Sequence, residues 1–100
     1  MDLGLAGAAA AVTGGTKGMG RAIAECFADE GARIAVLARS ASELEGTVAA
    51  LRERGAPDAA GISTDVSDPV QIDAAFAQIA ERWGSLNALV NNVDGGSDFM

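Results

Sequence analysis

The sequence predicts an α/β fold built around a parallel sheet, and two observations lead to that prediction. Short apolar runs alternate along the chain with longer stretches in which apolar residues recur every three or four positions. A glycine-rich stretch, residues 14–20, separates the first apolar run from the first helical stretch. Strands that alternate with helices form βαβ units, and such units place successive strands parallel within one sheet.

The first strand and the first helix are expected on either side of the glycine-rich stretch. Residues 8–13 are all of types found in the interior, as is typical of a strand buried on both faces. The first helix is expected to begin near Gly18 and to run to about residue 29. Its apolar face is predicted from residues spaced four apart: Met19, Ile23 and Phe27.

The second strand and helix follow directly. Residues 34–37 are apolar and predict a buried strand. Ser40 stands three positions before Glu43, which is the spacing of a capping box at the start of a helix. The apolar face of that helix is expected from Leu44, Val48 and Leu51.

The rest of the chain predicts one further helix between two strands. Residues 60–64 form a short, weaker strand, and residues 86–90 form the fourth. Asp68 is a natural N-cap, and Pro69 suits the first helical position. Gly84 is expected to end the helix, whose apolar residues recur at helical spacing: Ile72, Phe76, Ile79 and Trp83.

Right-handed crossovers applied to this series place the strands in the order 3-2-1-4. That order is one half of a doubly wound, Rossmann-type parallel sheet, so residues 1–100 are expected to form one half-domain. A sheet of this kind binds its ligand outside the carboxyl ends of strands one and four. Cys26 is interpreted as a small buried hydrophobe, and Trp83 as a core residue rather than a cofactor contact.

Composition argues against several classes of function. The formal net charge of −7 repels nucleic acid and anionic membrane surfaces, so neither is expected as a partner. A single cysteine rules out an internal disulfide, and without histidine or a CxxC pair no metal site is expected. The sequence has no run of about 18 apolar residues, so a membrane span is not expected. A cytoplasmic protein is expected.

The glycine-rich stretch carries the functional signal. Gly14, Gly18 and Gly20 follow the spacing GxxxGxG between a predicted strand and a predicted helix. Glycines let a pyrophosphate approach the main chain closely, and the N–H groups and dipole of the helix start attract the anion. Lys17 is followed by Gly18 and Met19, so the G-K-[ST] triplet of an ATP-binding P-loop is absent.

Residues 13–20 match the TGxxxGxG motif of the short-chain dehydrogenase/reductase family, and residues 89–92 resemble the start of its NNAG motif. The resemblance extends over essentially the whole chain. It implies a dinucleotide cofactor held by these residues: Gly14, Thr16, Lys17, Gly18, Met19, Gly20, Arg39, Asp65, Val66, Asn91 and Val93.

Two basic residues favour NADP(H) over NAD(H). Enzymes that prefer NAD usually end the second strand with an acidic residue that binds the ribose hydroxyls. Ala38 stands at that place, and Arg39 follows with a guanidinium that can hold phosphate through two hydrogen bonds. Lys17 lies where NADP-preferring relatives often carry a base. The alternative is that both are ordinary surface charges, but their joint placement favours the phosphate.

The resemblance also implies roles after the third and fourth strands. Asp65 would accept a hydrogen bond from the adenine amino group, and the backbone of Val66 would reach the ring. The other interpretation of Asp65 is a solvated turn residue. Asn91 resembles the family residue that ties the strands together near the cofactor, and Asp94 stands where the family motif has glycine.

Family catalysis uses a Ser, a Tyr and a Lys that lie later in the chain, and this sequence contains no Tyr. We therefore expect a fragment: the NADP-binding half of an oxidoreductase whose catalytic half is absent. The complete enzyme would transfer hydride between NADP(H) and a small-molecule carbonyl or secondary alcohol, as a dimer or tetramer of identical chains. The alternative is a non-catalytic dinucleotide-binding or sensor module.

Overall fold

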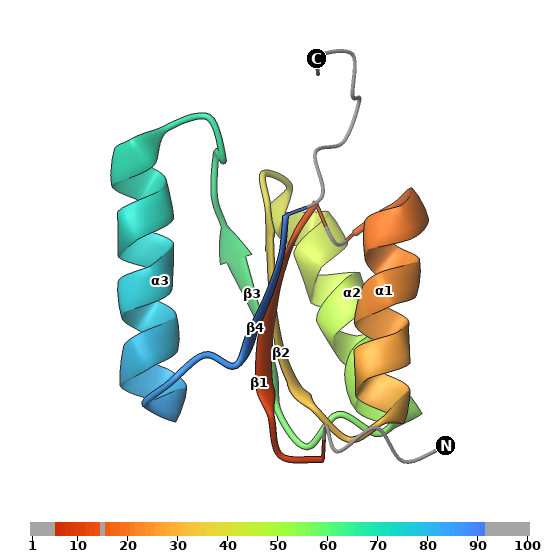
Figure 1. Ribbon diagram of the computed structural model, residues 1–100. Coiled ribbons are helices and arrows are strands. Elements are labelled where there is room, and N and C mark those ends of the chain that lie inside the picture. The colour runs from red at the N-terminus through yellow and green to blue at the C-terminus, as the bar shows by residue number, and fades with distance from the viewer. Residues whose placement is uncertain (1–5, 15, 92–100) are drawn as a thin grey trace.

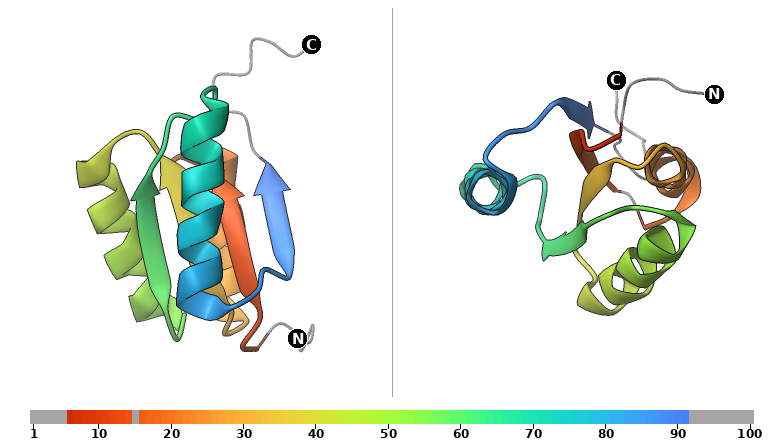
Figure 2. Two further views of the ribbon diagram at one scale, coloured as in Figure 1. Left: turned by 90° about the vertical axis from the view of Figure 1, so that its left-hand side faces the viewer. Right: turned by 90° about the horizontal axis from the view of Figure 1, so that it is seen from below.

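The protein, seen here in a computed structural model that describes residues 6–14 and 16–91, is a sheet with helices on both faces. The helices and strands follow one another as β1 (Ala9–Thr13), α1 (Gly18–Asp29), β2 (Arg33–Ala38), α2 (Ala41–Arg54), β3 (Ala59–Ser63), α3 (Pro69–Trp83) and β4 (Ala88–Asn91). Figure 1 shows α1 and α2 on one face of the sheet and α3 on the other, and the view from below in Figure 2 agrees.

The four-stranded sheet has the order β3-β2-β1-β4, which confirms the predicted topology. All three strand pairs are parallel. Val12 of β1 lies opposite Val36 on one side and Val90 on the other, so β1 is an interior strand. The winding direction reverses between β1 and β4, and their carboxyl ends therefore border the expected crevice.

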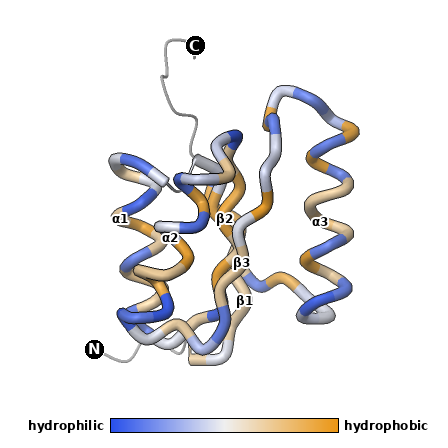
Figure 3. The backbone as a smooth tube through the Cα atoms, turned by 180° about the vertical axis from the view of Figure 1, so that it is seen from behind, coloured by the Kyte–Doolittle hydropathy of each residue, from blue (hydrophilic) through white to orange (hydrophobic). Residues whose placement is uncertain are grey.

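Apolar side chains form a core on each face of the sheet. Under α1 and α2 the buried cluster includes Ile34, Val36 and Leu51, and under α3 it includes Leu37 and Ile79. Figure 3 shows hydrophobic residues along the strands and hydrophilic residues in the turns and on parts of the helices. β1 and β2 are thus buried on both faces, as is typical of parallel strands between layers of helices, whereas β3 and β4 each include exposed residues.

The predicted helix ends are confirmed by their caps. Ser40 Oγ accepts a hydrogen bond from the Glu43 N–H at 3.3 Å, and Asp68 Oδ1 accepts one from the Val70 N–H at 3.0 Å. Gly84 ends α3 in the left-handed region, with a φ of 79°. Each cap satisfies a backbone group that the helix itself leaves unpaired, or turns the chain out of the helix.

The buried face of α1 is centred one position later than predicted, although Phe27 still packs against the core as a partly buried side chain. Gly20, Ala24 and Ala28 are the buried residues of the helix, whereas Met19 is 71% exposed. Small side chains let α1 approach the sheet closely, and the larger residues beside them then lie at the margin of the contact. Cys26 is exposed because it lies on the far side of the helix, so its interpretation as a buried hydrophobe is also corrected.

The fourth strand begins later than predicted. It spans Ala88–Asn91 rather than residues 86–90, and Asn87 lies just before it. The Asn87 N–H donates to the Ala9 carbonyl at 2.8 Å, and Asn87 Oδ1 accepts from the Ala9 N–H at 2.8 Å. Within the residues that the structure describes, no helix combines the length and the apolar character needed to cross a membrane.

Candidate functional site

The glycine loop leaves the carboxyl end of β1 and leads into α1. The Gly14 N–H donates to the Leu37 carbonyl of β2 at 2.8 Å, which holds the loop across the ends of the two strands. Gly14 and Gly18 have φ values of 66° and 55°, in the left-handed region where a side chain is strained. These two motif positions therefore have a backbone conformation that favours glycine.

The amino end of α1 lies at the same edge of the sheet. Lys17 is its N-cap residue and has an extended backbone, and its side chain makes no capping hydrogen bond. The first turn contains no acidic residue. The helix start therefore combines a positive dipole end with a lysine, a combination that favours an anion.

A pocket of about 470 Å³ opens beside the loop, and we call it the loop pocket. It brings together five predicted cofactor residues from three separate segments: Gly14, Thr16, Lys17, Arg39 and Val66. It is also lined by Leu37, Ala38, Ser40, Glu43 and Thr64. Of these, Ala38 was singled out for its neutral side chain, whereas Glu43 was predicted only as a capping residue.

Two ion pairs involve the basic residues of the loop pocket. Lys17 Nζ lies 3.5 Å from Glu43 Oε2, and Thr16 Oγ1 donates to Glu43 Oε1 at 3.2 Å. Arg39 Nη2 lies 3.2 Å from Asp65 Oδ1. Lys17 and Arg39, the two predicted phosphate-binding residues, thus each pair with a carboxylate of the same chain. Both ion pairs are accessible to water.

Asp65 occupies the turn after β3. The Ser67 hydroxyl and the Ser67 N–H both donate to Asp65 Oδ1, at 2.6 and 3.0 Å. These hydrogen bonds, led by that of the hydroxyl, and the Arg39 guanidinium lower the pKa of the Asp65 carboxyl. This is the geometry of a turn residue, and the contact with adenine stays a prediction.

The other predicted residues lie along the same edge without lining the loop pocket. Gly20 packs in the first turn of α1, next to the exposed Met19. Asn91 Oδ1 accepts a hydrogen bond from Thr13 Oγ1 at 3.1 Å, which joins the carboxyl ends of β4 and β1. Val93 and Asp94 lie outside the described residues.

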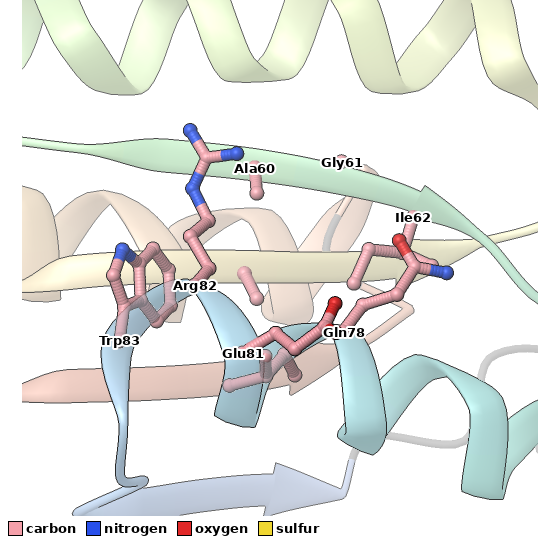
Figure 4. A pocket seen from close by; sticks show the side chains of 9 residues that line it. Ala60, Gly61, Ile62, Gln78, Glu81, Arg82 and Trp83 are labelled. Carbon is pink, nitrogen blue, oxygen red and sulfur yellow. The ribbon is translucent and has the colours of Figure 1, made fainter.

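A second pocket lies between β3 and α3, on the face of the sheet away from α1 and α2. It is lined in part by Ala60, Ile62, Arg82 and Trp83 (Figure 4). Trp83 Nε1 donates to Asp58 Oδ2 at 2.8 Å, and its ring packs against the core under α3. These contacts support the interpretation of Trp83 as a structural residue.

Known proteins resemble this chain along nearly its whole length. The family model described as short chain dehydrogenase matches residues 8–99. The short chain dehydrogenase/reductase dpchG of Colletotrichum higginsianum is 40% identical over 89 residues, 89% of this chain and 33% of the relative. Sorbitol dehydrogenase of Cereibacter sphaeroides is 43% identical over 88 residues, 88% of this chain and 33% of the relative.

A solved structure agrees in three dimensions. The L-sorbose reductase of Gluconobacter frateurii, crystallised with NADPH and L-sorbose, superposes with a TM-score of 0.92 at 36% identity. The match covers 100% of this chain and 38% of that protein. The chain therefore spans a little more than a third of that enzyme, and about a third of the two curated relatives.

Proposed function

This chain belongs to the short-chain dehydrogenase/reductase family of oxidoreductases, and we propose that it binds NADP(H) in preference to NAD(H) at the carboxyl edge of its sheet. The family uses a nicotinamide dinucleotide. The preference for the 2′-phosphate form rests on one observation: Lys17 and Arg39 both line the loop pocket, together with the neutral Ala38. The two cations come from different segments of the chain and converge on one hollow.

The residues at this edge fit a dinucleotide. The left-handed backbone at Gly14 and Gly18 and the amino end of α1 suit a pyrophosphate. Lys17 and Arg39 would hold the 2′-phosphate, and Arg39 can do so with two parallel hydrogen bonds. Val66, which lines the pocket, and Asp65, in the turn beside it, would contact the adenine. The NADPH in the L-sorbose reductase structure, which shares this fold, supports the same cofactor class.

The chemistry is proposed for the whole protein of which residues 1–100 form the cofactor-binding half-domain. A bound nicotinamide supplies or accepts the hydride at a carbonyl or secondary-alcohol carbon of a small molecule, and a protein acid or base supplies or accepts the proton. These 100 residues contain no tyrosine, so their part is to bind and orient the cofactor. We also propose that the whole protein assembles from identical chains.

Calorimetric titration of the chain with NADP⁺ and with NAD⁺ tests the cofactor preference. A charge-assisted grip on the 2′-phosphate is expected to make NADP⁺ bind about tenfold more tightly, or better, at low ionic strength. Equal affinities, tighter binding of NAD⁺, or binding of neither would contradict the proposal.

A further inference from the structure

Glu43 contacts the glycine loop from the first turn of α2. Its two carboxylate oxygens are used separately: Oε1 accepts from the Thr16 hydroxyl, and Oε2 lies 3.5 Å from the Lys17 ammonium. The side chain lines the loop pocket and is 42% exposed, so a ligand entering that pocket would meet it.

The orientation of the Glu43 side chain departs from the usual capping box. In that motif the glutamate at the third helical position reaches back to the backbone N–H of the N-cap residue. Here Ser40 performs its half, because its hydroxyl accepts from the Glu43 N–H. The carboxylate itself is directed to Thr16 and Lys17, so its contacts serve the loop rather than the helix end.

The arrangement affects how the pocket distinguishes two dinucleotides. A 2′-phosphate that approaches Lys17 must compete with Glu43 for the ammonium, and it is repelled by the carboxylate. A ribose with a free 2′-hydroxyl carries no such charge and can donate a hydrogen bond to a carboxylate. The side chain of Ala38 offers no acceptor at the end of β2, and Glu43 is the acidic residue among those that line the pocket.

We propose that Glu43 is a specificity-determining residue that limits the preference of the pocket for a 2′-phosphate by competing for Lys17. This inference rests on the proposed function, since it concerns the same cofactor pocket. Lys17 attracts the 2′-phosphate, and Glu43 opposes that attraction chiefly through their ion pair. Removing the carboxylate therefore increases the preference for ligands with a 2′-phosphate, and removing the ammonium as well reduces that increase.

The test uses adenosine 2′,5′-bisphosphate and AMP, which differ only in the 2′-phosphate, and the Glu43→Gln variant. Glutamine keeps the length of the side chain and an acceptor for Thr16, but it carries no charge. We expect the bisphosphate to bind about fivefold more tightly to the variant at low salt, as suits a partly exposed ion pair. AMP is expected to bind equally well or more weakly.

Glu45→Gln is the matched control. Glu45 lies two positions further along the same helix and is exposed, and it lines a groove between α2 and β3 rather than the loop pocket. Its replacement changes the net charge equally, so an equal gain in bisphosphate affinity would reduce the Glu43 effect to overall charge and overturn the inference. Glu43→Ala also removes the carboxylate, and alanine is favourable in a helix. This variant should therefore bind the bisphosphate more tightly than the wild-type chain does, as Glu43→Gln should.

A double-mutant cycle with Lys17→Gln completes the design. Glu43→Gln should increase bisphosphate affinity in the wild-type chain and increase it clearly less in a chain that already carries the Lys17→Gln substitution, where only the direct repulsion by the carboxylate is relieved. If the wild-type chain prefers the bisphosphate to AMP and Glu43→Gln leaves that ratio unaltered, this inference is overturned and the proposed function stands. If the wild-type chain shows no preference, the proposed cofactor preference fails, whatever the variant does.

Discussion

Arg82 donates two hydrogen bonds to Asp58, at 2.8 and 2.9 Å, and so joins the last turn of α3 to the residue just before β3. Trp83 Nε1 donates to the same carboxylate, and Arg52 of α2 lies 3.2 Å from it. Helices on opposite faces of the sheet thus contact one side chain. The hydrogen bonds from Arg82, reinforced by Trp83 and Arg52, hold the pKa of Asp58 well below its usual range.

Replacement of Asp58 is predicted to destabilise the fold. Asp58→Asn keeps the size of the side chain but removes the charge that both arginines contact, and the site is partly open to water, so we expect a loss of about 1–2 kcal/mol in the free energy of unfolding. Urea denaturation followed by circular dichroism measures it. Asp73→Asn, an equal charge change at an exposed position of α3, should change the free energy by less than about 0.5 kcal/mol.

The same carboxylate predicts a dependence of stability on pH. Because the pKa of Asp58 is lower in the folded protein than in the unfolded chain, its contribution is fully present above the unfolded value of about 4 and is lost as the pH falls below it. The wild-type chain should therefore lose more stability between about pH 5 and pH 2 than Asp58→Asn does. Denaturation curves of both proteins, measured at several pH values in this range, test this. Equal losses in the free energy of unfolding would show that Asp58 is not responsible.

Arg39→Asp is predicted to reverse the order of the two cofactors. The substitution removes a charge-assisted donor to the 2′-phosphate and places a repelling carboxylate at the same point of the loop pocket. Titration calorimetry should show NAD⁺ bound more tightly than NADP⁺. Ala38→Asp is the companion variant, since it adds an acidic residue at the end of β2 while keeping Arg39, and it should shift the ratio in the same direction by a smaller amount.

Asn87 is predicted to stabilise the start of the pairing between β1 and β4. Its side-chain carbonyl accepts from the N–H of Ala9, a fully buried residue. Asn87→Leu leaves that N–H without its acceptor and should cost about 1–2 kcal/mol in the free energy of unfolding. Asn87→Asp keeps an oxygen at the same place and should retain most of the stability, so an equal loss in both variants would count against the hydrogen bond.

The order of elements could be predicted because each boundary has its own residue type. Asp68, Pro69 and Gly84 mark the ends of α3 by local chemistry alone, and Gly14 and Gly18 mark a loop that needs left-handed backbone. Such signals depend on near neighbours in the chain, so a single sequence contains them.

The errors concern contacts between distant segments. Periodicity weighted by hydrophobicity placed Met19 in the core, whereas the sheet accepts Ala24 and Ala28 because small residues allow the closest packing. The spacing of Ser40 and Glu43 correctly predicted a helix start, but the direction of the carboxylate depends on a loop some 27 positions away. Asn87 gave no signal, because its partner Ala9 lies 78 positions earlier.

Trp83 places a fluorescent side chain at the amino-terminal ends of the strands. It is the single tryptophan of a chain without tyrosine, so emission excited in the absorption band of indole comes from one residue. That indole lies beside Arg33, whose guanidinium carbon is 5.6 Å from the ring centroid, and beside Asp58, at the amino-terminal edge of the strands. Its fluorescence therefore monitors the integrity of the Asp58 cluster directly, at the end of the strands opposite the glycine loop.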